Sequence, residues 1–134
     1  PLATPRIGDF TMKNPTLAIV AAGVVAWAFA VPAAAQDLAK TAGKEAKVVL
    51  DNTRVRVIEL NMAPGASTGM HSHGDNVVVF VSGGDAVQTM ADGTTKTMSR
   101  KPGEVVWSGP VTHDTKNTGK AAVRTLVIEL KDAK

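Results

Sequence analysis

The chain contains no cysteine and few aromatic residues, and both absences narrow what it can be. Without cysteine it has no disulfide bond, no thiolate metal ligand and no cysteine nucleophile. Aromatic residues make up 4% of the 134 residues, so valine, isoleucine, leucine and methionine must fill the core. The formal net charge is +3, but no cluster of basic residues interleaves with aromatic ones. The sequence therefore carries no sign of a nucleic-acid partner.

The sequence also lacks the motifs of several enzyme classes. It has no Gly-x-Ser-x-Gly nucleophile elbow, no His-Glu-x-x-His zinc motif and no glycine-rich loop that would cradle a phosphate. Nothing in the pattern singles out Ser82 or Ser108 as a nucleophile. The remaining candidates for chemistry are the histidines, of which the whole chain has three.

Residues 12–35 have the order of a secretory signal peptide: a basic start, an apolar run and small residues at the end. The apolar run, Leu17 to Val31, falls short of the ~20 residues that span a bilayer. We therefore expect a hydrophobic signal helix that is cut after Ala35, and an exported, periplasmic protein with no stable membrane span. A retained anchor and a buried core helix are the alternatives.

The rest of the chain divides into a short lead and one strand-rich domain. Residues 1–11 show no periodicity, and we expect them to be unstructured upstream sequence. Residues 36–44 are polar and rich in alanine, which indicates a linker or a short helix. From residue 45 to 131, about eight short strand-like runs recur at intervals of about ten residues, with turn residues between them. Such a series predicts an all-β sandwich or barrel.

Three details of the strand series make sharper predictions. Residues 76–82 are apolar on both faces, as in a central strand. Residues 85–90 and 94–99 flank an Asp-Gly pair, which predicts a β-hairpin. The sequence Val-Ile-Glu-Leu occurs at 57–60 and again at 127–130. We predict that these two strands lie side by side in one sheet.

All three histidines lie in glycine-led, strand-rich segments. His71 and His73 are two positions apart, so in a strand their side chains point to the same face. His113 follows a second run that begins at Gly103. An imidazole from another strand would complete a facial set around one divalent metal, and neutral imidazoles suit iron, zinc, nickel or copper. The alternative is three histidines that are packed or solvent-facing without a metal.

The two histidine segments resemble the two sequence motifs of the cupin superfamily. The matching glycines, histidines and asparagine are Gly65, His71, His73, Gly84, Gly103, His113 and Asn117. The glutamate of the first motif falls on Val77 or Val78, and Gly109 and Val111 occupy the proline and glycine positions of the second. The resemblance covers roughly residues 45–131. It implies a small single-domain cupin, a jelly-roll-like double-stranded β-helix with a metal on His71, His73 and His113, and a homodimer.

Three further residues are candidates for the site. Asp75 has the strand parity of His71 and His73, so its carboxylate could replace the missing glutamate, although a role in the turn is the alternative. Gln88 could approach from the next strand. Trp107 could line an apolar pocket or simply belong to the core.

Two main functions remain open at this point. One is a metal-dependent enzyme, of oxygenase type by family resemblance, that acts on a small molecule. The other is a non-catalytic module that binds a metal or a small ligand. Open metal positions beneath a pocket would favour the enzyme. A barrel that has lost its metal is a third reading.

Overall fold

The computed structural model describes residues 36–132, so the predicted signal helix over 12–35 and the segment 1–11 lie outside the described residues. The elements in order are α1 (Leu38–Thr41), the 3₁₀ turn η1 (Gly43–Glu45), β1 (Ala46–Asp51), β2 (Val55–Met62), β3 (His71–His73), β4 (Asn76–Phe80), β5 (Gly84–Met90), β6 (Thr95–Arg100), β7 (Val105–Ser108), β8 (Val111–Asn117) and β9 (Val123–Leu130). No helix in this part of the chain is long and apolar enough to cross a membrane.

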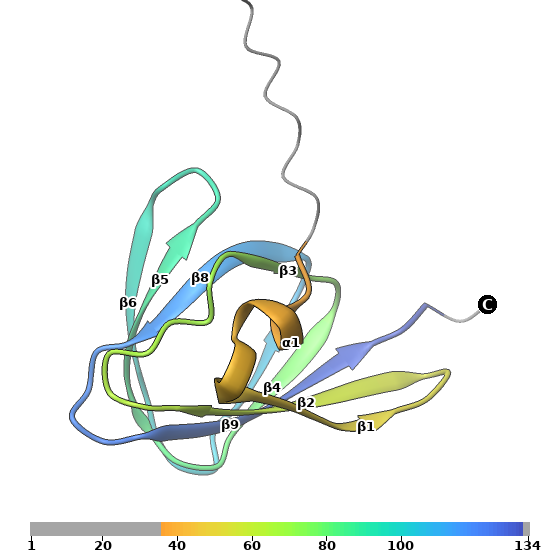
Figure 1. The fold of residues 1–134 in the computed structure, drawn as a ribbon, viewed down its shortest axis with the longest axis horizontal. Helices are drawn as coiled ribbons and strands as arrows, with labels where there is room; N and C mark the ends of the chain where they lie inside the picture. The colour runs from red at the N-terminus through yellow and green to blue at the C-terminus, as the bar shows by residue number, and fades with distance from the viewer. Residues whose placement is uncertain (1–35, 133–134) are drawn as a thin grey trace, which may run out of the picture. The chain divides into compact units, whose positions relative to one another are not determined.

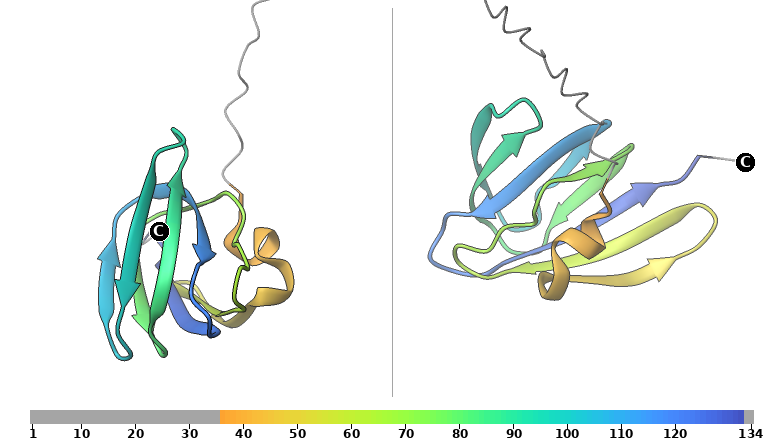
Figure 2. Two further views of the ribbon diagram at one scale, coloured as in Figure 1. Left: turned by 90° about the vertical axis from the view of Figure 1, so that its left-hand side faces the viewer. Right: turned by 45° about the horizontal axis from the view of Figure 1, so that its top comes forward.

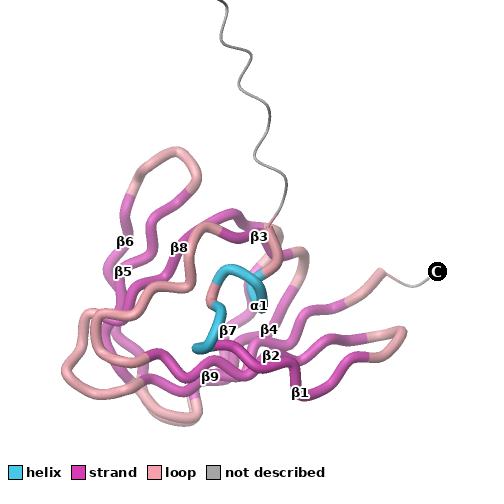
Figure 3. The backbone as a smooth tube through the Cα atoms, viewed as in Figure 1, coloured by secondary structure: helices cyan, strands magenta, loops and turns pink. Residues whose placement is uncertain are grey.

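The strands form two antiparallel sheets (Figures 1 and 3). Sheet A has the order β1-β2-β9-β4-β7, and sheet B has the order β3-β8-β5-β6. The predicted all-β architecture is confirmed. Strand β3, which carries two of the histidines, is the shortest, with three residues.

The pairing of β2 with β9 confirms that the two Val-Ile-Glu-Leu strands are neighbours. Val57 lies opposite Ile128, and Ile58 lies opposite Val127. The predicted hairpin is also confirmed, because β5 and β6 pair as adjacent antiparallel strands. Strand β4 pairs with both β9 and β7, so it is a central strand of sheet A, as its sequence predicts.

The apolar core lies on the inner face of sheet A. Ile58 is fully buried, and Leu60 and Met62 follow it at alternate positions along β2. Val127 on β9 and Phe80 on β4 complete this layer. Burial of each such side chain contributes about 1.5–3 kcal/mol to the free energy of unfolding.

The segment that the sequence left open between a linker and a short helix forms α1 and η1 (Figure 2). The carboxylate of Asp37 caps α1, accepting a hydrogen bond of 2.8 Å from the backbone N–H of Ala39. Leu38 is 1% exposed and belongs to the core. The carbonyl of Gln36 accepts a hydrogen bond of 3.0 Å from the N–H of Ser72 on β3. This segment is therefore tied both to the core and to the strand that bears His71 and His73.

Two of the motif glycines are required by the backbone. Gly65 has a φ of +78°, a conformation that side chains disfavour. At Gly84 an added Cβ would lie 2.3 Å from Cγ2 of Val123, so the start of β5 could not approach β9 so closely with any other residue.

Candidate metal centre

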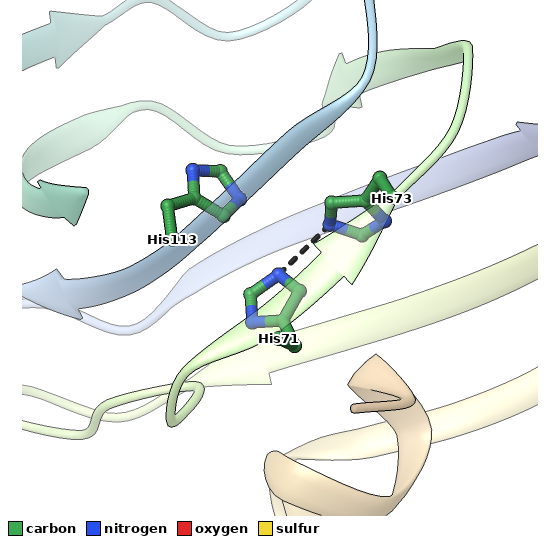
Figure 4. A group of neighbouring side chains, drawn as sticks. All are labelled: His71, His73 and His113. Carbon is green, nitrogen blue, oxygen red and sulfur yellow. Dashed lines mark hydrogen bonds between the residues drawn. The ribbon is translucent and has the colours of Figure 1, made fainter. Parts of the chain in front are cut away.

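The pairing of β3 with β8 brings the three histidines together. His71 lies directly opposite His113 in the register, and His73 shares the face of His71 because side chains alternate along a strand. The ring centroids are 4.6 Å apart for His71 and His73, 4.8 Å for His71 and His113, and 5.6 Å for His73 and His113. Figure 4 shows the rings gathered between the two strands.

Hydrogen bonds at the outer nitrogens decide which tautomer two of the rings adopt. Nδ1 of His71 lies 2.7 Å from the carbonyl oxygen of Gly69, which can only accept. Nδ1 of His73 lies 2.9 Å from Oε1 of Glu129. Both Nδ1 atoms therefore carry the proton in the neutral rings, and both Nε2 atoms present a lone pair. These two Nε2 atoms are only 2.8 Å apart (dashed line in Figure 4).

Two facing lone pairs at this distance repel each other unless a proton or a metal ion lies between them. His113 also has a ring nitrogen that lacks a partner: its buried Nδ1 makes no hydrogen bond with the described residues. Within residues 36–132, ligand nitrogens of the three histidines all lie within 4.8 Å of one another. Two metal–nitrogen bonds of about 2.1 Å span about 4.2 Å at most, so a small shift of one ring would let all three bind one ion. The donor set therefore fits a transition metal.

Burial keeps two of these rings neutral. Burial lowers the pKa of His71, against the opposing effect of its hydrogen bond to Gly69. Burial, and then repulsion from His71 and His73, lowers the pKa of His113 to about 4. Neither ring has to release a proton at pH 7 before it can bind a metal.

A chain of charged groups supports His73 from behind. Glu129 on β9 accepts the Nδ1 proton of His73, and its other carboxylate oxygen lies 3.7 Å from Nη1 of Arg56, its cross-strand neighbour on β2. Arg56 in turn donates hydrogen bonds of 2.6 and 3.2 Å to Asp37, and these bonds lower the pKa of Asp37. A carboxylate in this position fixes the orientation of a ligand histidine and makes its other nitrogen more basic.

The loop before β3 is tied to the two residues of β8 that follow His113. The carboxylate of Asp114 accepts hydrogen bonds of 2.5 Å from Ser67 and 3.1 Å from Thr68. The hydroxyl of Thr68 accepts a third, of 2.9 Å, from the N–H of Thr115. These bonds hold the two histidine-bearing strands in register.

The three further sequence candidates lie in different places. Asp75 is exposed in the turn between β3 and β4, and it is not part of the histidine group in the described chain. Gln88 lines the cavity beside the histidines. Trp107 is among the residues beside the same cavity, but it is 60% exposed and lies opposite Val77 on the outer face of sheet A. Val78, at one of the two positions where the motif glutamate was sought, is an apolar part of the cavity wall.

This cavity has a volume of about 260 Å³ and lies between the two sheets. The three histidines form part of its wall, together with apolar side chains of sheet A and a few polar groups of sheet B. Sites for small molecules usually combine an apolar lining with a few polar groups in this way.

The sequence did not single out Glu129, Arg56 or Asp37. Glu129 lies 56 residues from its partner His73, and Arg56 lies 19 residues from Asp37. The two Val-Ile-Glu-Leu segments did mark Glu59 and Glu129 as strand glutamates. Which of them lies next to a histidine depends on the strand register, and the sequence alone does not give that register.

Several solved structures share this fold. A cupin domain from Bordetella pertussis Tohama I is 30% identical, with a TM-score of 0.61 over 65% of this chain and 92% of that one. An RmlC-like cupin protein with a double-stranded β-helix fold from Methanocaldococcus jannaschii is 12% identical, with a TM-score of 0.53 over 64% of this chain and 78% of that one. The polyketide cyclase RemF from Streptomyces resistomycificus is 21% identical, with a TM-score of 0.50 over 66% and 67%. No protein-family profile and no curated protein matches the chain.

The carboxylate behind His73 generates a prediction for metal affinity. We expect Glu129→Gln to weaken zinc binding by roughly 10- to 100-fold, because glutamine keeps the shape of the side chain but loses the charge that orients His73. Titration of the full chain with zinc against a competing chelator measures this. The matched control is Glu59→Gln, which removes a carboxylate paired at 2.6 Å with Arg124. An equal loss in both variants, or none in either, would contradict the role of Glu129.

The lowered pKa values predict how stability depends on pH. In the unfolded chain the imidazoles take up protons near pH 6.5, whereas folded His113 does so only near pH 4. Between these values the unfolded state binds more protons, so the free energy of unfolding of the metal-free protein should decrease as the pH falls. Urea unfolding at pH 7 and pH 5, with His113→Asn as the control, tests this. A wild type and a variant with the same pH dependence would count against it.

Proposed function

The chain belongs to the cupin superfamily, and from this premise we propose that it binds one divalent transition metal through His71, His73 and His113 and acts on a small molecule in the adjoining cavity. The observation that carries the proposal is the 2.8 Å contact between Nε2 of His71 and Nε2 of His73. Both outer nitrogens are already bonded to acceptors, so the inner lone pairs are free for a metal.

Three protein ligands leave positions at the metal for water or substrate, which is the arrangement of catalytic sites. When bound, the metal would supply Lewis-acid chemistry, or oxygen chemistry if it is redox-active. No carboxylate joins the histidine group in the described chain, which favours iron, zinc, nickel or copper over harder ions. An oxygenase-type reaction is our first candidate, by analogy with cupins that hold iron with three histidines.

The residues of the chain itself would hold and shield this centre. The carbonyl of Gly69 accepts a hydrogen bond from Nδ1–H of His71, and the carboxylate of Glu129 accepts one from Nδ1–H of His73. In the neutral rings both Nε2 atoms therefore stay unprotonated. Apolar side chains across the cavity would exclude bulk water from the substrate.

A non-catalytic module that binds a metal or a small ligand is the alternative. It has the same metal ligands, and it differs in whether the bound small molecule is changed. Substrate turnover by the metal-loaded protein, followed by mass spectrometry, separates the two.

The metal ligands are tested by thermal melting with and without zinc, nickel, copper or iron(II). Binding to the folded state alone should stabilise it by about 2.7 kcal/mol when the free metal is at ~100 times its Kd. We expect this rise in Tm for the wild type and not for His73→Ala, which lacks one of three ligands. Asp75→Ala is the matched control and should keep the rise, because Asp75 lies in the adjoining turn outside the histidine group. If no metal stabilises the wild type, or if His73→Ala responds equally, the proposed site does not exist.

We also propose that the chain forms a homodimer through the outer face of sheet A. One apolar row crosses the neighbouring strands β7, β4, β9 and β2, and each member lies opposite the next: Trp107, Val77, Ile128 and Val57. Trp107 at the end of this apolar row is 60% exposed, and exposed apolar patches mark interaction surfaces. We expect the wild type to have the mass of a dimer at micromolar concentration and Trp107→Lys to have that of a monomer. A monomeric wild type would refute the proposal.

A further inference from the structure

A row of three polar side chains lies next to the histidines on the inner face of sheet B. Lys96 on β6 lies opposite Gln88 on β5, and Gln88 lies opposite Thr115 on β8. Thr115 is two residues from His113 on the same strand, so the two side chains share a face. All three members of the row line the cavity. The polar row therefore lies beside the metal ligands on the same inner face of sheet B.

This row offers a positive charge and hydrogen-bond donors with few partners of their own. Lys96 takes part in none of the ion pairs found among residues 36–132. Within the described chain, the side chain of Gln88 makes one hydrogen bond, to Thr115, and it is long at 3.4 Å. Lys96 is exposed although it lines the cavity, so it lies where the cavity opens to solvent. A ligand entering the cavity would meet these donors.

A second cation lies on the same strand. Arg100, four residues after Lys96, also lines the cavity, and its guanidinium group stacks over Phe80 at 5.7 Å. Nη1 of Arg100 pairs with Glu104 at 2.7 Å, which offsets its charge. Its Nε, however, is buried and has no hydrogen-bond partner in the described chain. Strand β6 thus presents two cationic side chains to the cavity, of which Lys96 is not neutralised.

Three charged residues line the cavity, Lys96, Arg100 and Asp85, so the balance of charge is positive. Asp85 is exposed and lies on the opposite face of β5 from Gln88. A divalent metal held by the three histidines would add further positive charge to this wall. The carboxylate of Glu129 is turned to the outer nitrogen of His73 and to Arg56. A cavity with a net positive charge and an apolar lining concentrates ligands of the opposite sign.

We propose that the cavity binds a small organic acid, whose carboxylate lies on the row of Lys96, Gln88 and Thr115 and whose apolar body reaches toward the histidines. This inference rests on the proposed metal site only for the end of the ligand that reacts. Same-face residues along a strand are about 7 Å apart and adjacent strands about 4.8 Å apart, so the ligand would span roughly 7–12 Å. Leu60, Met62 and Val127 on the facing sheet provide the apolar surface for its body.

The inference is tested with paired probes of equal shape, benzoate with benzamide and phenylacetate with phenylacetamide. Their affinities for the full chain, with and without zinc, are measured by calorimetry. We expect at least one carboxylate to bind the wild type more tightly than its amide. Lys96→Gln should weaken that binding about 10-fold, or about 1.4 kcal/mol, because it removes the charged partner of the carboxylate. The amide and zinc affinities should stay unchanged. Lys96→Arg, which keeps the charge, should retain most of the affinity.

Lys116→Gln is the matched control, because Lys116 is exposed on β8 next to Thr115 and lies on the opposite face of that strand. If it weakens carboxylate binding as much as Lys96→Gln does, net charge alone is responsible and the inference fails. It also fails if neither carboxylate is preferred over its amide.

An inward lysine on an edge strand can instead serve to prevent strand pairing between copies. In that case Lys96→Gln would raise the mass in solution and leave the carboxylate affinity unchanged, which overturns the proposal. Loss of zinc binding with retained carboxylate preference in the metal-free protein would refute the metal site and not this inference.

Discussion

The centre of this structure depends on two imidazole lone pairs that face each other at 2.8 Å. The arrangement persists because each ring is held from its outer nitrogen, His71 by the carbonyl of Gly69 and His73 by the carboxylate of Glu129. The register of β3 with β8 then places His113 opposite His71. A metal ion would turn this repulsion into three bonds, so the same contacts that are unfavourable in the metal-free chain prepare the site for binding.

The two sheets contribute different parts of the site. Sheet B carries the histidines and the polar row, whereas sheet A carries the apolar core and the carboxylate behind His73. The cupin motif would place a glutamate near Val78, where the chain has only an apolar wall. Glu129 brings a negative charge to the outer side of a ligand histidine instead. The metal would thus keep more of its positive charge, which suits the binding of an organic anion.

The strand series, the hairpin and the pairing of the two Val-Ile-Glu-Leu segments were predictable from sequence, because alternation and turn residues are local signals. The grouping of His71, His73 and His113 was predictable from parity and from the cupin motifs. The support of His73 was not, since it joins β3 to β9 and, through Arg56, to Asp37 at the start of α1. Such contacts depend on which strands pair and in which register, and the local sequence pattern determines neither.

The central claim is that three imidazoles bind one metal ion, and X-ray absorption of the zinc-loaded full chain tests it most directly. We predict one zinc per chain, with three imidazole nitrogens at about 2.0–2.1 Å and oxygen from water in the remaining coordination. Zinc bound by fewer than three imidazoles, or zinc that does not bind in a one-to-one ratio, would contradict the account.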